Sequence, residues 1–217
     1  MPFEFVNSAV VALVEDVRPA VLHPSSLERI VPSEWQVVEG PVSTPPFAYV
    51  KYSSGLSLTA EMGKLMVVDE SDLAGKETSN SWAFAPKFLR LMAAARIRAI
   101  GINFAMLVQA DDPGRLLRSR FVVDGPWCQP PNKLEAVSLG FAYDLSPGVL
   151  RVQCDPGRVL RALPTDLAPR LVTGVVLNLN FHVDLVSATL DEAEVEIRRF
   201  SERLKHAERI VESMFGD

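Results

Sequence analysis

Four polar side chains alternate with apolar ones in the segment LNLNFHVDL, which runs from residue 177 to residue 185. They are Asn178, Asn180, His182 and Asp184. Because successive side chains of a β-strand point to opposite faces, these four share one face of a predicted strand. A carboxylate two residues from a histidine could orient the imidazole or bind a metal with it. The two amides could donate or accept hydrogen bonds beside them.

The same alternation is typical of an antiparallel strand with one face in solvent, and it favours that interpretation because no site is needed to explain it. Two asparagines are nevertheless unusual, since asparagine disfavours β structure. A third metal ligand is not evident, because the sequence does not position His23 or His206 relative to this strand. We therefore predict neither a metal nor a cofactor. The candidate binding residues are Asn178, Asn180, His182, Asp184 and Asn103, the last of which is matched to Asn180 by the repeat described below.

Composition narrows the class of protein. The chain has 217 residues, of which 48% are hydrophobic and 23% charged, as in an ordinary globular protein long enough to bury a core. Its net charge of -5 argues against a dedicated nucleic-acid-binding protein, whose affinity comes from neutralising phosphates. The contiguous motifs GxxxxGK[ST], GxGxxG, GxSxG and HExxH are absent from the sequence.

Targeting signals are also missing from the sequence. The N-terminal segment MPFEFVNSAVVALVED has no basic leader, and Cys128 and Cys154 form no CxxC motif. The longest charge-free apolar stretch, LVTGVVLNLNFHV, is too short and too polar to cross a membrane. We expect a cytoplasmic protein without a membrane span.

Hydrophobic periodicity and turn residues predict an α+β fold. The predicted strands and meanders cover residues 9–17, 34–40, 47–70, 99–109, 136–162 and 175–185. The predicted helices cover residues 24–30, 86–98, 111–121 and 191–215, and residues 163–171 form a connection. The connections are too short for many parallel crossovers, so we expect a mainly antiparallel, curved sheet with helices on one face.

Two segments of the chain resemble each other. FAYVKYSSGLSLTAEMGKLMV begins at Phe47, and FAYDLSPGVLRVQCDPGRVLR begins at Phe141. Further on, INFAM matches LNFHV, which makes Asn103 equivalent to Asn180, and each is followed by a segment with an acidic start and a basic end. This order predicts an internal duplication into α+β halves at residues 1–124 and 125–217, together forming one compact unit.

The layout is similar to that of a sporadically distributed family of uncharacterised bacterial proteins of about this length. The resemblance is carried by LERIVPSEWQVV, YSSGLSLTAEMGKLMV and IGINFAM, followed by a late strand and a C-terminal helix. It covers most of the chain, although Gly101 and Ile102 stand where that family has an Arg-Tyr pair. The resemblance implies a fold and a bacterial origin but no activity and no site.

The C-terminal helix has a narrow apolar seam with spacings of three and four. The seam residues are Ala193, Ile197, Phe200, Leu204, Ala207, Val211 and Met214. Two arrangements fit this pattern. The helix lies across its own sheet, or it pairs with a second copy through Ile197, Phe200, Leu204 and Val211.

Three hypotheses on function follow. The first is a binding or protein-interaction protein that forms homo-oligomers, as the helix seam and the small residues Ala99, Gly101 and Ala105 indicate. The second is a small-molecule-binding or hydrolytic enzyme that uses His182 and Asp184, with or without a metal. The third is a ligand cavity closed by the C-terminal helix. The sequence identifies no substrate, ligand or partner.

Overall fold

The computed structural model describes residues 2–17, 22–44, 46–71, 74–92, 95–128, 134–161 and 168–216. In these ranges the chain forms one nine-stranded sheet with antiparallel neighbours throughout, so the predicted α+β class with a mainly antiparallel sheet is confirmed. The strands are β1 (Phe3–Val14), β2 (Val37–Thr44), β3 (Phe47–Tyr52), β4 (Leu56–Glu61), β5 (Lys64–Asp69), β6 (Ile97–Gln109), β7 (Leu139–Asp144), β8 (Val149–Arg161) and β9 (Arg170–Asp184). The helices are α1 (Pro24–Leu27), α2 (Asn80–Arg90), α3 (Pro113–Phe121), the short 3-10 helix η2 (Pro126–Cys128), α4 (Leu190–Arg198) and α5 (Phe200–Phe215).

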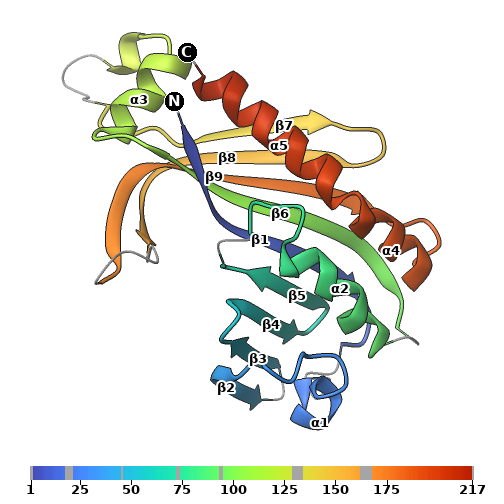
Figure 1. Cartoon of the computed structure of the whole chain (residues 1–217). Coiled ribbons are helices and arrows are strands. Elements are labelled where there is room, and N and C mark those ends of the chain that lie inside the picture. Colours follow the sequence, from blue (N-terminus) through green and yellow to red (C-terminus); the bar gives the residue numbers. More distant parts are fainter. Residues whose placement is uncertain are drawn as a thin grey trace.

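Two strands at the centre organise the sheet, whose order is β2-β3-β4-β5-β1-β6-β9-β8-β7. β1 and β6 pair with each other, and each begins a meander that returns to it: β5 closes against β1, and β9 closes against β6. Figure 1 shows α2, α4 and α5 over the same side of the curved sheet, while the far end of the β8–β9 hairpin bends away from α5. We call the opposite side of the sheet the open face.

The sheet is continuous across the predicted division at residues 124 and 125. β6, which precedes this point, pairs with β9 from Ala99 opposite Asp184 to Gln109 opposite Gly174. Asn103 therefore lies directly opposite Asn180 in the neighbouring strand, whereas the sequence matched the two as equivalent positions of a repeat.

β8 is longer than the sequence indicates. The Asp155-Pro156-Gly157 segment is typical of a turn, yet it continues the strand opposite β9. β7 pairs with β8 only as far as Cys154, so Pro156 lies on a free edge where its missing N–H breaks no ladder bond. The predicted connection at 163–171 falls largely on residues 162–167, which lie outside the described residues.

α2 begins six residues earlier than its predicted start at Pro86. Ser79 caps it by accepting a hydrogen bond from the Ser81 N–H, and the Asn80 N–H donates to the Asp69 carboxylate at 2.6 Å. A carboxylate at a helix N-terminus stabilises the helix through its free N–H groups and its dipole. Asp69 is distant in sequence, so the pattern around Pro86 does not reveal this start.

The C-terminal segment forms two helices, because Arg199 (ψ 5°) separates α4 from α5. All seven seam residues are buried within the chain, and the Phe200 ring lies 5.1 Å from the Phe104 ring of β6. The predicted homodimer contact through Ile197, Phe200, Leu204 and Val211 is therefore corrected: these side chains form the core between helix and sheet. No helix among the described residues is long and apolar enough to cross a membrane.

Candidate functional site

The polar row of β9 lies on the open face. Asn178 and Asp184 are exposed, Asn180 and His182 are half-buried, and the alternate residues of the strand pack under the helices. The alternation therefore follows the layering of the sheet, as an antiparallel strand with one solvent-facing side requires.

His182 and Asp184 contact each other at the end of this row. His182 Nε2 lies 3.2 Å from Asp184 Oδ1, and their side chains are 27% and 89% exposed. The other histidines do not join them: His23 bonds Ser25 near α1, and the His206 ring lies 5.7 Å from the Phe181 ring on the helix side. No group of three or more metal-ligating side chains occurs in the part of the chain that the structure describes.

Asn103 and Asn180 form a cross-strand pair. Asn180 Nδ2 donates to Asn103 Oδ1 at 2.6 Å, next to Gly101 on β6. Such a pair satisfies both amides in part and fixes the register of the two strands. This contact gives a structural reason for two residues that are otherwise unfavourable in strands.

Replacing His182 or Asp184 with alanine is expected to change the free energy of unfolding by less than about 1 kcal/mol, because exposed ion pairs contribute little. Thermal unfolding with and without Zn²⁺ checks this, and parent and variants should respond to the metal alike. A Zn²⁺-dependent rise in Tm that both variants lose would instead support a metal site on the open face.

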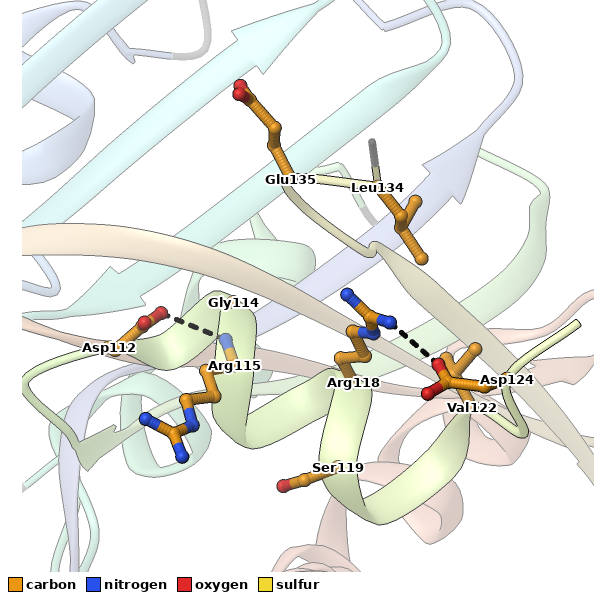
Figure 2. A pocket seen from close by; sticks show the side chains of 9 residues that line it. All are labelled: Asp112, Gly114, Arg115, Arg118, Ser119, Val122, Asp124, Leu134 and Glu135. Atoms are coloured by element: carbon orange, nitrogen blue, oxygen red, sulfur yellow. Dashed lines mark hydrogen bonds and ion pairs between the residues drawn. The ribbon is translucent and has the colours of Figure 1, made fainter. Parts of the chain in front are cut away.

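A broad hollow of about 670 Å³ lies beside α3 (Figure 2). Arg118 Nη2 donates to Asp124 Oδ1 at 2.7 Å, and this bond lowers the pKa of Asp124. Asp112 accepts from the Arg115 N–H and so caps the helix. In Figure 2 the side chains of Arg115 and Glu135 point away from the Arg118–Asp124 pair. The charged side chains are exposed or half-buried, and Arg118 and Asp124 pair with each other, so the hollow has no buried polar group that requires a ligand.

A smaller pocket of about 390 Å³ lies on the helix side of the sheet, at the end where α1 lies beside β2 and β3 (Figure 1). We call it the Tyr52 pocket. It is lined by Leu22, Leu27, Glu28, Val31, Pro32, Ser33, Trp35, Val37, Val50 and Tyr52. The deep lining residues Leu22, Leu27, Val50 and Tyr52 are buried, whereas Glu28, Ser33 and Val37 are exposed at the rim. The walls are therefore mainly apolar, as in many small-molecule sites.

Local structure explains why these residues meet. In β3 the alternation of buried and half-buried residues turns Val50 and Tyr52 toward the helix side. α1 continues into a turn in which the N–H groups of Ile30 and Val31 donate to the Leu27 carbonyl. After Pro32 the chain reverses, and the Trp35 N–H donates to the Pro32 carbonyl.

An aromatic wall closes one side of the pocket. The Trp35 ring stacks on Phe84 of α2 with centroids 5.8 Å apart, and it lies 6.3 Å from the Tyr52 ring. Phe84 is itself buried in the core. The position of Trp35 thus depends on α2, so the pocket connects three parts of the chain.

Tyr52 carries the polar group of the deep end. The residue is only 4% exposed, yet the described part of the chain provides its hydroxyl with no hydrogen-bond partner. Arg161 Nε is the one fully buried side-chain nitrogen or oxygen without a partner in that part, so the Tyr52 oxygen is not sealed from solvent. Tyr52 lines the pocket, so we interpret the pocket as the opening through which solvent reaches this oxygen. Burial raises the pKa of Tyr52 to about 12, so the hydroxyl remains a protonated donor at neutral pH.

A buried polar network was also not predicted from the sequence. The Asp69 carboxylate, Ser8, Ser79 and Ser81 are fully buried and hydrogen-bonded to one another between β1, β5 and α2. All four side chains have no solvent exposure, so a substrate cannot reach these serines. Its contacts anchor the start of α2, so we interpret it as structural.

No protein-family model matches the chain, and no curated protein matches it.

Proposed function

We propose that the protein binds a small, largely apolar molecule in the Tyr52 pocket. One observation carries this proposal: Tyr52 is 4% exposed, its hydroxyl has no hydrogen-bond partner in the described chain, and the residue lines a pocket of ligand-like volume. Because this hydroxyl still reaches solvent, water can bond it in the free protein, and a ligand that replaces the water has to supply a hydrogen bond in its place. A bound molecule would supply the bond and would also cover the apolar walls.

The dimensions and the walls agree with this role. Pockets for small molecules enclose roughly 300–1,000 Å³ and combine apolar lining with a few polar groups that orient the ligand. The Tyr52 pocket meets both conditions, with one hydroxyl at depth and Glu28 and Ser33 at the rim. The larger hollow beside α3 lacks such a buried group.

The dye N-phenyl-1-naphthylamine provides a direct test, because its fluorescence rises in apolar sites. We expect the parent protein to bind it and the Val37→Phe variant to bind it about tenfold more weakly or worse, since the added ring occupies the pocket. Val37 is half-exposed at the rim, so the larger side chain should be tolerated in the fold. Fluorescence titration measures both affinities.

Val38→Phe is the matched control. Val38 follows Val37 in β2, is also exposed and does not line the pocket. This variant should bind the dye as the parent does. A parent that binds no dye, or two variants with equal affinities, would contradict the proposal.

Other expectations from the sequence stay predictions. They are homo-oligomerisation, a cytoplasmic location, the lack of nucleic-acid binding and the bacterial family resemblance. We also infer that the chain arose by duplication. This is supported by a recurring order of a central strand, a short helix, a meander returning to that strand, and helical structure after it. The order recurs from β1 to α2 and from β6 to α5, so it favours a division before β6 in place of the predicted one at residues 124 and 125.

A further inference from the structure

We infer that the ligand of the Tyr52 pocket is a neutral molecule with a flat ring and a carbonyl-type hydrogen-bond acceptor, which binds with the acceptor at the Tyr52 hydroxyl. This inference rests on the proposed function and adds the chemical class of the ligand. Three features of the lining residues support it: the hydrogen-bond donor of Tyr52, the sign of the charges around the pocket, and the shape of the aromatic wall.

Among the buried lining residues that the structure describes, Tyr52 is the one with a polar side-chain group, and the half-buried Trp35 adds an indole N–H nearer the surface. Leu22, Leu27 and Val50 provide only apolar surface at the deep end, and Tyr52 provides a hydroxyl without a partner among the described residues. The protonated hydroxyl can both donate and accept, and the bond that we assign is donation of its proton to a ligand oxygen. A ligand oxygen that accepts this proton leaves no unpaired donor in the apolar end.

The charges around the pocket disfavour an anionic ligand. None of the described lining residues is a lysine, arginine or histidine, and the charged lining group is the carboxylate of Glu28 at the rim. Burying a carboxylate or phosphate without a cationic partner is costly. A neutral acceptor such as a ketone or an amide forms the same hydrogen bond without that cost.

The shape of one wall favours a flat ring. Trp35 and Tyr52 lie 6.3 Å apart with an angle of 47° between their rings. Two aromatic side chains at this distance offer a ligand ring faces and edges at favourable stacking geometry. The remaining wall, from Val31, Pro32 and Val37, is aliphatic and suits the edge of such a ring.

Three compounds of one shape test the inference: 2-acetylnaphthalene, 2-ethylnaphthalene and 2-naphthoate. Each is titrated against the complex of the protein with N-phenyl-1-naphthylamine, and displacement of the dye gives its affinity. We expect 2-acetylnaphthalene to bind roughly three- to tenfold more tightly than 2-ethylnaphthalene, because one hydrogen bond is added. The anionic 2-naphthoate should bind most weakly.

Tyr52→Phe removes the hydroxyl and keeps the ring. In this variant the preference for 2-acetylnaphthalene over 2-ethylnaphthalene should disappear, while 2-ethylnaphthalene still displaces the dye. Tyr49→Phe is the control, because Tyr49 belongs to the same strand but its hydroxyl lies toward Glu39 on the open face. It should keep the full preference.

The outcomes separate the two proposals. If neither the dye nor 2-ethylnaphthalene binds the parent protein, the pocket is not a ligand site and the proposed function fails. If 2-ethylnaphthalene binds as well as 2-acetylnaphthalene, or if 2-naphthoate binds best, the pocket stands but the assigned ligand class is wrong. The ranking in the parent protein decides this even if Tyr52→Phe does not fold.

Discussion

Replacement of Asp69 with alanine is expected to lower the free energy of unfolding by about 3 kcal/mol or more, because buried groups that hydrogen-bond to a charge lose their partner. Asp69 Oδ1 accepts from the Ser71 N–H at 2.9 Å and from Ser71 Oγ at 2.6 Å. Oδ2 accepts from Ser79 Oγ at 3.0 Å and from the Asn80 N–H at 2.6 Å. Alanine would remove the acceptor of all four donors. Asp69 and Ser79 have no solvent exposure, and Ser71 and Asn80 are half-buried.

The effect should extend beyond stability. Two of the four donors belong to the first residues of α2, and this helix carries Phe84, on which Trp35 of the Tyr52 pocket stacks. If α2 starts in a less defined position, the aromatic wall of the pocket loses part of its support. We therefore expect Asp69→Ala to weaken binding of the dye as well.

Glu70→Ala is the control for Asp69→Ala. Glu70 is the next residue, and its carboxylate forms a partly exposed ion pair with Lys51. Such pairs contribute about 0–1 kcal/mol, so this variant should stay close to the parent protein. Urea unfolding followed by circular dichroism gives both free energies. Equal stabilities of the two variants would show that the buried network does not hold α2.

Elements with regular periodicity could be predicted from the sequence. The alternation in β9 and the three-and-four spacing along α4 and α5 correspond to the buried faces of these elements. In each case one face packs on the core, so burial imposes its period on the residues. The seam also predicted two arrangements of the C-terminal helix, one across its own sheet and one against a second copy of the chain. The spacing alone could not distinguish them.

Features that depend on distant residues could not be predicted in this way. The start of α2 depends on Asp69, and the strand character of Pro156 depends on the free edge beyond β7. Asn103 and Asn180 were matched as repeats because both follow apolar residues, but antiparallel pairing brings them face to face. Local pattern carries no information on which strand becomes the neighbour.

The Tyr52 pocket belongs to the same category. Leu27, Trp35 and Tyr52 come from a short helix, a loop and a strand, and no spacing in the sequence connects them. The polar row on β9 was visible because its members are consecutive in one strand. Polar residues that alternate along one strand could thus be identified from the sequence. The pocket could not, because its lining residues meet only when three separate elements pack together.

Replacement of Phe200 with alanine is expected to cost about 3–5 kcal/mol of stability, which is usual for removal of a buried phenylalanine. The Phe200 ring is fully buried, 5.1 Å from the Phe104 ring and 6.2 Å from the Trp82 ring. It therefore joins the start of α5 to β6 and α2. Urea unfolding measures the loss, and Val195→Ala, at an exposed position of α4, should change the free energy by less than about 0.5 kcal/mol.

The dependence on protein concentration distinguishes the two arrangements of the seam. If Phe200 packs inside one chain, the urea midpoints of the parent protein and of Phe200→Ala depend on protein concentration to the same extent. If the seam instead joins two copies, the parent midpoint rises with concentration, because dimerisation stabilises the folded state by mass action. Phe200→Ala would then lose that rise. Since Phe200 lies between α5 and the sheet in a single chain, we expect a large loss of stability and the same concentration dependence for both proteins.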